Sequence, residues 1–474
     1  MLQITRERLT LILIGLLPFH AFLVTVGTKI IAGPGHSPLP MLALWKEALL
    51  GVILMIAVLE AVKLKMDPST RSGGQLTIDV LDICIVSLLL WSLLQPLILN
   101  SPFSIFHYAV GFKYDFLPLV VFLILRRVTW SPAFVRTAVA VLLGVGGIVA
   151  VYGIATLFFP ISWFTALGYS DLHSLYIPGG PLAPFQQIEA SGLRRIQSTF
   201  SGPNQLGLWL LIPLSLSLAR LRKSFRSPAQ WQDIAYLSFL GLVLLKTFSR
   251  AAWIGAAVIL IIGLWKVLPR KQFKVASCGL LVSGSVILAM GIFFAPEVLL
   301  RVASSRGHIE RPLEALRIMR DHPFGLGLGA AGPASNRFSD TCVDLPAGAD
   351  ASWAQPHPQL CVFVGGTQTQ PLDRVCTCPL LPENWYLQIG VELGWIGFIL
   401  YIFLVVTILR RSFLQLATCN QVSVASCKLQ STCALAFLGI SIAALFLHAW
   451  EDSAVAYTVW VLMSAVLPVR LARI

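Results

Sequence analysis

The sequence PENWYLQIGVELGWIG (residues 382–397) joins the longest polar segment of the chain to a long apolar one. A carboxylate, an amide and two aromatic side chains stand at this junction, from Glu383 to Tyr386. Trp and Tyr are typical of the boundary between water and hydrocarbon in membrane proteins. We therefore interpret the junction as the point where the chain enters a membrane, and the rest of the chain as the scaffold that holds it.

The composition also indicates a membrane protein. The 474 residues are 56% hydrophobic and only 12% charged, whereas soluble domains carry about 25% charged residues. In a soluble protein the formal net charge of +13 would indicate nucleic-acid binding, but in a membrane protein Lys and Arg mainly set the orientation of the helices. We therefore predict no nucleic-acid partner. Arg6 and Arg8 precede a long apolar run without a small-residue cleavage site, so this run is predicted to be a spanning helix.

A helix needs about 20 apolar residues to cross a membrane. Twelve segments reach or approach this length, so the sequence predicts an all-α, polytopic membrane protein of about twelve transmembrane helices. The predicted spans are 9–27, 41–62, 78–98, 114–125, 137–158, 201–219, 233–248, 251–268, 275–295, 385–409, 430–449 and 454–469.

Lys and Arg favour the cytoplasmic side of a membrane. If the N-terminus is cytoplasmic, every predicted inner segment is basic, while the short outer loops at 28–40, 99–113 and 449–453 are nearly free of Lys and Arg. An even number of spans then places both termini in the cytoplasm.

The predicted spans divide the chain into three parts. Residues 1–295 hold transmembrane helices 1–9, residues 296–384 form a large outer loop between the ninth and tenth helices, and residues 385–474 hold helices 10–12. The loop begins with a predicted amphipathic helix from Gly307 to Asp321. Four cysteines on an oxidising face predict disulfides in any of three pairings, and these are Cys342, Cys361, Cys376 and Cys378.

Two arginines precede a predicted helix start, where Arg194 and Arg195 are followed by Ser-Gly-Pro-Asn ending at Asn204. A helix N-terminus offers free N–H donors and a partial positive charge, and the planar guanidinium fits phosphate oxygens. The pattern predicts an anion site at the membrane surface to which these three residues contribute. The alternative is a snorkelling arginine pair beside an ordinary helix cap.

A further cation, Arg250, stands in the tight turn between two predicted spans, on the outer face where no orientation rule requires it. A cation held between helices at membrane depth is a functional candidate. The alternative is that Arg250 pairs with a neighbouring carbonyl or carboxylate.

The predicted amphipathic helix of the outer loop is basic and carries Arg306, His308 and His322 on it or beside it. A basic amphipathic helix can lie on lipid headgroups and contact their phosphates. We therefore take these three residues as candidates for substrate binding and membrane lipids as partners. The alternative is a solvated charged face.

At the opening junction, Glu383 precedes a span in a region of basic clusters. A carboxylate there could act as a general base toward a hydroxyl group, with Asn384 and Tyr386 contacting the same group. The alternative is a carboxylate that stabilises the helix N-terminus, beside aromatic residues of the membrane boundary. We find no His/Cys metal spacing and no Walker sequence, and we reject the match of residues 327–332 to G-x-G-x-x-G because no strand precedes it and no βαβ unit surrounds it. We therefore predict neither metal nor cofactor.

Taken in order, four stretches of the chain resemble the O-antigen ligase-related family of bacterial polysaccharide enzymes. They run from Arg195 to Gly207, Thr247 to Trp253, His322 to Gly329, and Glu383 to Gly397. The resemblance covers roughly residues 100–450. Each motif alone is short, and the resemblance rests on the ordered set.

This resemblance implies twelve transmembrane helices in a bacterial inner membrane and a metal-independent, inverting glycosyltransferase acting on the outer face. The donor would be a glycan on undecaprenyl diphosphate, and the acceptor a lipid-linked core sugar, a growing glycan or a protein hydroxyl. Residues at the positions of Arg195 and Arg250 are implied to bind the diphosphate. The first outer loop, 28–40, has no carboxylate, which argues against a metal-dependent transferase.

One position departs from the ligases of the family. Where they have a His that is proposed as the base, this chain has Glu383. Glu383 is therefore our predicted catalytic base, together with Arg195 and Arg250 as catalytic cations. Alternatively, His308, His322 or His357 supplies an imidazole.

A second hypothesis is a transporter or flippase of lipid-linked saccharides, which would share the spans and a cationic cavity. Transporters often consist of two similar halves. The large loop divides the predicted spans nine to three, and we find no such symmetry. A transferase is therefore the primary prediction.

Overall fold

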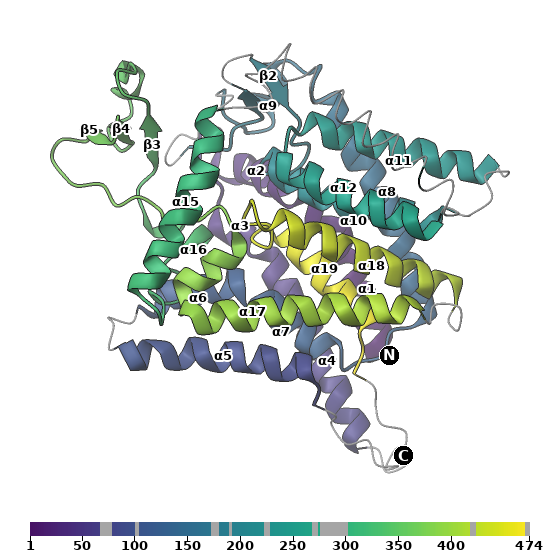
Figure 1. Cartoon of the computed structure of the whole chain (residues 1–474). Coiled ribbons are helices and arrows are strands. Elements are labelled where there is room, and N and C mark those ends of the chain that lie inside the picture. The colour runs from purple at the N-terminus through teal and green to yellow at the C-terminus, as the bar shows by residue number, and fades with distance from the viewer. Residues whose placement is uncertain are drawn as a thin grey trace.

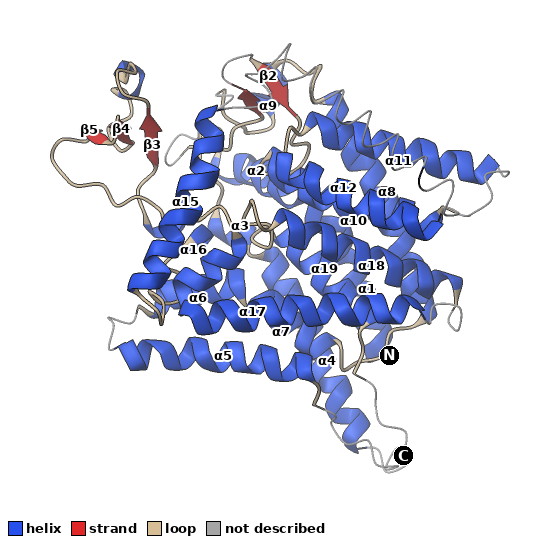
Figure 2. Ribbon diagram, viewed as in Figure 1, coloured by secondary structure: helices blue, strands red, loops and turns tan. Residues whose placement is uncertain are grey.

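The computed structural model describes residues 1–66, 78–99, 104–171, 180–188, 192–221, 228–267, 274, 302–417 and 423–469. Most of these residues are helical, and the strands form two small sheets (Figure 2). The helices are α1 (Leu2–Leu16), η1 (Leu17–Phe19), α2 (His20–Ala32), α3 (Pro40–Ala43), α4 (Trp45–Met66), α5 (Val80–Leu99), α6 (Ile105–Asp115), α7 (Leu117–Leu125), α8 (Pro132–Ala155), α9 (Ile161–Ala166), α10 (Pro203–Arg220), α11 (Pro228–Lys246), α12 (Arg250–Val267), α15 (Val302–Asp321), α16 (Gly332–Phe338), η3 (Ser352–Ala354), α17 (Trp385–Ala417), α18 (Val424–Ala443) and α19 (Ser453–Val466). The strands are β1 (Gln186–Ile188), β2 (Leu193–Arg195), β3 (Cys342–Leu345), β4 (Cys361–Val364) and β5 (Thr367–Gln370).

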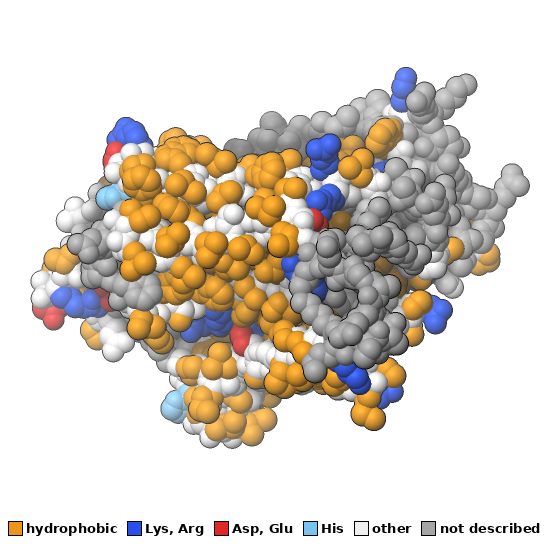
Figure 3. All heavy atoms as spheres, turned by 90° about the horizontal axis from the view of Figure 1, so that it is seen from below, with side chains coloured by type: hydrophobic (Ala, Val, Ile, Leu, Met, Phe, Trp, Pro, Cys, Tyr) orange, Lys and Arg blue, Asp and Glu red, His pale blue; other side chains and the backbone are white. Residues whose placement is uncertain are grey.

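Several helices have the properties of membrane spans. Among the described residues, six are long and apolar enough to cross a membrane, and the bent pair α6–α7 would be a seventh. Figure 3 shows a broad hydrophobic face on the side of α5, where Ile83, Leu90 and Leu97 are exposed. These features are consistent with an all-α membrane protein. The six are Leu2–Ala32, Pro40–Lys63, Val80–Ile98, Pro132–Ala155, Trp385–Leu416 and Val424–Ala443.

The predicted spans can be compared with these helices. The ninth, 275–295, lies outside the described residues, and helices occupy all or most of each of the others. Helices α10, α11, α12 and α19 lie on predicted spans but are not among the six.

Two predicted boundaries were wrong. The span predicted at 114–125 is the second part of a longer helical stretch, because α7 begins at Leu117, beside Pro118, after a bend of 54°. The span predicted to end at 449 ends at Ala443, because the carbonyl groups of the next two residues accept hydrogen bonds from the start of α17 and the residue before it. Trp385 N–H donates to the oxygen of Ala444 (2.9 Å), and Asn384 Nδ2 donates to that of Leu445 (3.0 Å).

The start of α17 is interlocked with the glycine-rich segment that follows α15. Trp395 N–H donates to the oxygen of Pro323 (3.0 Å), and Leu326 N–H donates to that of Val391 (2.9 Å). Gly394 has φ +67°, and a Cβ there would lie 2.2 Å from the oxygen of Pro323. Only glycine permits both the conformation and the close approach. Two motifs that are far apart in the sequence thus form one unit.

Helix α15 runs across the ends of the other long helices on one side of the molecule (Figure 1). Its inner face buries Ala315 and Met319 against Leu387 and Val391 of α17. Its outer face exposes apolar side chains, among them Leu313. The amphipathic pattern in the sequence therefore corresponds to a helix that packs on one side only.

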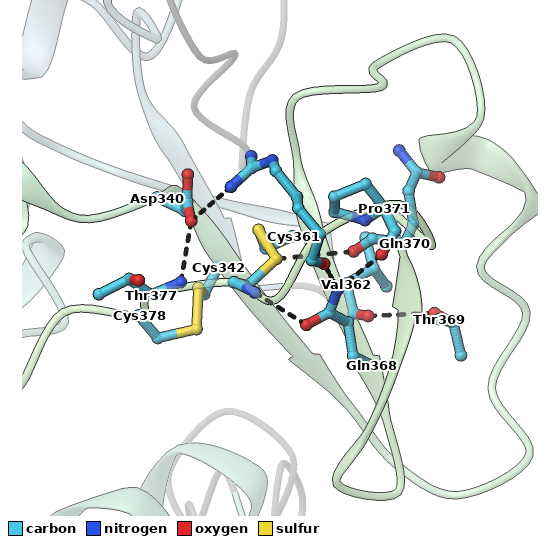
Figure 4. The surroundings of a disulfide bond; sticks show 12 residues. Asp340, Cys342, Cys361, Val362, Gln368, Thr369, Gln370, Pro371, Thr377 and Cys378 are labelled. Carbon is cyan, nitrogen blue, oxygen red and sulfur yellow. Dashed lines mark hydrogen bonds and ion pairs between the residues drawn. A yellow bond between two sulfur atoms is a disulfide. The ribbon is translucent and has the colours of Figure 1, made fainter.

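The segment that follows α16 is the disulfide module, which we define as residues 340–378. It holds a three-stranded sheet in the order β3-β4-β5, with β3 parallel to β4, and it projects from the helical body in Figure 1. The disulfides are Cys342–Cys378 and Cys361–Cys376, one of the three pairings that the sequence left open. Figure 4 shows how Asp340 closes the base of the module by accepting hydrogen bonds from Arg374 (2.8 Å) and Thr377 N–H (2.9 Å).

Candidate active site

A cavity of about 460 Å³ collects residues from five separate parts of the sequence. We call it the first cavity. It lies between the starts of α10 and α12, the helix α15, the residues that precede α17, and the connection from α18 to α19. The polar residues of its lining are Arg195, Asn204, Gln205, Ser249, Arg250, His308, Glu383, His448, Glu451 and Asp452.

Arg195 is held in position at the wall of this cavity. Its Nε donates to the oxygen of Thr247 (2.9 Å) and its Nη1 to Gln186 Oε1 (2.9 Å). Its Nη2 donates to Asn204 Oδ1 (3.0 Å) and to the oxygen of Phe248 (3.5 Å). The residue is only 8% exposed, and these four acceptors are neutral oxygens. They orient the guanidinium in advance, so a ligand would not have to order the side chain.

Arg250 reaches the same cavity because the connection between α11 and α12 is very tight. Phe248 adopts φ +50°, and Ser249 N–H donates to Thr247 Oγ1 (3.2 Å). This turn makes Arg250 the first residue of α12, at the cavity wall and within electrostatic range of Glu383. Two arginines that are distant in sequence therefore line one hollow.

Glu383 faces the arginines across the cavity and is paired with two residues of α15. Its Oε2 lies 2.6 Å from Nδ1 of His308, and its Oε1 accepts from Arg311. Glu383 adopts φ +52°, an uncommon conformation for a residue other than glycine. Burial raises the pKa of Glu383, but the hydrogen bond from His308 and the positive charge of Arg311 outweigh it, so the pKa lies below the ordinary value. Glu383 is therefore ionised at neutral pH.

The backbone of Glu383 is positioned by His448. Glu383 N–H donates to Nε2 of His448 (3.2 Å), and Nδ1 of the same ring lies 2.6 Å from Gln388 Oε1. Because Nε2 accepts, the ring proton belongs on Nδ1, from which it can donate to Gln388. Burial lowers the pKa of His448 to about 4, in agreement with a neutral ring. Gln388 in turn donates to Asp115 Oδ1 (3.0 Å), which ties the chain to α6.

Five of the residues predicted from the sequence lie together in the first cavity, namely Arg195, Asn204, Arg250, His308 and Glu383. This arrangement places two cations on one side and an ionised carboxylate paired with an imidazole on the other. Such a site can bind an anionic group and accept a proton from a neighbouring hydroxyl.

Other predicted residues do not line this cavity. Arg194 is the neighbour of Arg195 in β2, where successive side chains point to opposite faces. Its guanidinium donates to the oxygen of Phe159 (3.0 Å) and lies 4.3 Å from the ring centroid of Phe185. His322 follows the end of α15, and His357 belongs to the disulfide module.

The predicted partners of Glu383 in the junction have structural contacts. Asn384 caps α17, since its Oδ1 accepts from Leu387 N–H (3.0 Å). Tyr386 is 5% exposed and donates to the oxygen of Ser441 (2.7 Å). The side chain of Arg306 lies outside the described residues.

The sequence reasoning missed four ionisable residues at or beside this site, and these are Arg311, His448, Glu451 and Asp452. Three of them lie in or next to the last predicted outer loop. A signal for His448 was present, because an ionisable residue within a predicted span is itself a functional candidate.

A metal site is not apparent in the part of the chain that the structure describes. The side chains of Asp340, Cys361 and Cys376 bring potential ligand atoms within 4.8 Å of one another. The two sulfurs are joined in a disulfide, however, and the carboxylate is paired with Arg374. This group therefore does not fit a metal ion.

No model of a known protein family matches the chain, and no curated protein matches it at a significant level. The features that bear on function are the geometry of the first cavity and the ordered motifs of the sequence.

Proposed function

We propose that this protein is a metal-independent, inverting glycosyltransferase of the bacterial inner membrane. It has twelve spans and cytoplasmic termini, and it transfers a glycan from an undecaprenyl-diphosphate donor to an acceptor hydroxyl on the outer face. The observation that carries the proposal is the meeting of Arg195, Arg250, Glu383 and His308 in the first cavity. The two disulfides of the neighbouring module support the outer location, since disulfides persist on oxidising faces.

The two arginines hold the diphosphate of the donor. A guanidinium binds phosphate oxygens with two parallel hydrogen bonds and stays charged at all relevant pH values. The negative charge on the diphosphate grows as the glycosyl bond breaks. Cations that are already in place stabilise that charge, and such preorganised charges are often the largest catalytic contribution.

The Glu383–His308 pair accepts the proton of the acceptor hydroxyl. Either the Glu383 carboxylate is the base, or Glu383 orients His308 through Nδ1 so that Nε2 takes the proton. The lowered pKa of Glu383 makes its carboxylate a weak base, which favours His308 as the proton acceptor. Glu383 then stabilises the imidazolium, as a carboxylate does for a histidine base in other enzymes.

The reaction is a single displacement. The oxygen of the acceptor forms a bond to the anomeric carbon from the face opposite the leaving group. The bond from that carbon to the diphosphate oxygen breaks, and its electron pair remains on the diphosphate. The proton of the hydroxyl passes to the Glu383–His308 pair, so atoms and charges balance.

The test is to purify His308→Ala, Glu383→Gln and Arg250→Ala separately and to measure transfer from a lipid-linked glycan. We expect the His308 variant to lose about 10²–10⁴-fold, the usual contribution of general base catalysis. Glu383→Gln keeps a side chain of the same shape but lacks the charge, so its loss is smaller. Arg250→Ala should lose activity toward the diphosphate donor.

His322→Ala and Arg374→Gln are matched controls, because both residues belong to the outer insert but neither lines the first cavity. Both should transfer at the normal rate. Unchanged transfer in His308→Ala and Arg250→Ala, at normal protein levels, would overturn the proposal. Movement of the intact lipid-linked glycan across liposomes without covalent change would favour a transporter instead.

A further inference from the structure

A second cavity, of about 240 Å³, adjoins the first. The two share three lining residues, Gln205, Glu451 and Asp452. The second cavity is otherwise lined by different elements, chiefly η1, α2, the start of α4, the junction of α6 with α7, and α19. Its volume is below the roughly 300–1,000 Å³ typical of sites for drug-sized ligands. It therefore has room for about one sugar-sized unit.

Cations from three parts of the chain meet at this second cavity. Lys46 is 4% exposed, and its Nζ lies 3.6 Å from Glu47 Oε1, to which Lys113 Nζ is also close (3.1 Å). Arg337, on α16, donates from Nε to the phenol oxygen of Tyr114 (2.9 Å). Lysine that is nearly fully buried at a cavity wall is uncommon without a partner, and here one carboxylate serves two ammonium groups.

Two acidic residues of the lining, Asp452 and Glu451, form no salt bridge with these cations among the described residues. Asp452 caps α19 by accepting from the N–H groups of Ala454 (2.9 Å) and Val455 (3.1 Å). Burial, together with the neighbouring Asp452 and Asp115, raises the pKa of Glu451 to about 8, so its carboxyl is largely protonated at neutral pH. Arg337 donates to a neutral phenol oxygen, and Lys113 shares the Glu47 carboxylate with Lys46, so Arg337 and Lys113 remain available to an anionic ligand.

Aromatic side chains complete the lining. Trp450, Tyr457 and Phe200 are buried there, and Tyr114 lies beside Lys113 and Arg337. Apolar rings combined with a few convergent polar groups are a common arrangement for a small organic ligand. Lys46, Lys113, Tyr114, Arg337 and the Glu451 carboxyl can all donate hydrogen bonds. The lining thus suits a ligand with hydroxyl groups and one negative charge.

We propose that the second cavity binds a saccharide unit that carries a carboxylate or a phosphate group. Its adjacency to the first cavity, through the wall formed by Gln205, Glu451 and Asp452, makes this unit the terminal part of the acceptor. The assignment to the acceptor rests on the proposed function, whereas the binding of an anionic saccharide does not. Lys113 and Arg337 are the residues that select for the negative charge.

The test is binding of monosaccharides to the purified full chain in detergent, without donor, by saturation-transfer NMR at millimolar concentrations. The probes are glucuronate, glucose 6-phosphate and neutral glucose. We expect at least one anionic sugar to bind about tenfold more tightly than glucose. The double variant Lys113→Gln/Arg337→Gln should weaken that binding about tenfold or more, because charge-assisted hydrogen bonds are lost. Glucuronate and glucose 6-phosphate distinguish the carboxylate from the phosphate.

Arg250→Ala distinguishes the two cavities, because it removes a cation of the first cavity alone. A sugar in the second cavity should bind this variant normally, whereas weaker binding would place the anionic sugar in the first cavity and overturn the proposal. Equal binding of glucose and both anionic sugars, no binding of any of them, or normal binding by the double variant would overturn the proposal. Normal sugar binding in a protein that transfers no glycan would contradict the proposed function and leave this site standing. In an active protein, the double variant should raise the KM for the acceptor and retain kcat.

Discussion

Two glutamates in the stretch 382–397 have opposite surroundings. Glu383 stands at a cavity wall, and its carboxylate is paired with the side chains of His308 and Arg311. Glu392 is fully buried, and its Oε1 accepts from the backbone N–H groups of Gly329 (3.0 Å) and Ala331 (3.1 Å). Both residues belong to the same motif, and nothing in their immediate sequence separates their roles.

The difference shows which carboxylate is available for chemistry. The side chains of His308 and Arg311 can rotate away from Glu383 and leave its carboxylate free to contact a substrate, so this carboxylate can take part in a reaction. Backbone N–H groups inside the interlocked unit cannot move away without unfolding it, so Glu392 serves the fold. We therefore expect substitutions at Glu383 to affect activity and substitutions at Glu392 to affect stability.

The largest effect on stability should come from Glu392→Ala. It leaves two buried N–H donors without an acceptor, at a cost of about 1–3 kcal/mol each. We expect the variant to unfold at a markedly lower temperature, measured by Trp fluorescence in detergent, or not to accumulate. Glu392→Gln retains an oxygen acceptor and should be much closer to the wild type. If Glu392→Ala were as stable as the wild type, Glu392 would have no structural role.

Gly394→Ala tests the interlocked unit in the same stretch. The added Cβ would meet the oxygen of Pro323 at 2.2 Å in a left-handed conformation, which should cost about 1–3 kcal/mol. We expect a lower unfolding temperature. Gly241→Ala is the matched control, because a Cβ there has no neighbour within 4 Å, and it should be neutral or slightly stabilising. Similar behaviour of the two variants would contradict the interlock.

At Glu383 the effect on stability should be smaller and depend on pH. Because its pKa is lowered below the ordinary value of 4.5 in the folded protein, its stabilising contribution is present above that value. The contribution is lost as the pH falls through the lowered pKa. The wild type should therefore unfold at a higher temperature than Glu383→Gln at pH 6, and the gap should close below pH 4.5. Exposed Glu314→Gln on α15 is the control, and a gap that persists in acid would contradict the ion pairing.

The smallest effect should come from a third carboxyl group, that of Glu451. It concerns sugar binding and not stability, and it should appear at alkaline pH. With a pKa of about 8 Glu451 gains a negative charge as the pH rises through that value. The charge would appear on the wall shared by the two cavities and weaken the binding of an anionic sugar. Titration of glucuronate binding from pH 6 to 9 should show a decline in the wild type that is clearly smaller in Glu451→Gln. If glucuronate binding by the wild type did not change between pH 6 and 9, the predicted effect of Glu451 would be wrong.

The helical, membrane-type fold could be predicted from the sequence because an apolar run of about 20 residues has the length and composition of a helix that crosses a membrane. Arg195, Arg250 and Glu383 could be assigned to one face because each lies near the outer end of a predicted span, whereas their meeting with His308 in one cavity is seen only in the structure. The roles of Arg194, Asn384 and Tyr386 could not be predicted in this way. Whether a polar side chain faces a cavity, caps a helix or contacts a carbonyl depends on the backbone that surrounds it.

The sequence by itself determined where most of the apolar helices lie and that an insert with four cysteines precedes residue 385. These properties depend on composition and local periodicity. Only the tertiary structure decided that Glu383 faces a cavity and Glu392 does not, and that two cavities share a wall at Glu451. The physical reason is that burial, charge pairing and hydrogen-bond partners arise from segments far apart in the chain, whose meeting is settled by packing.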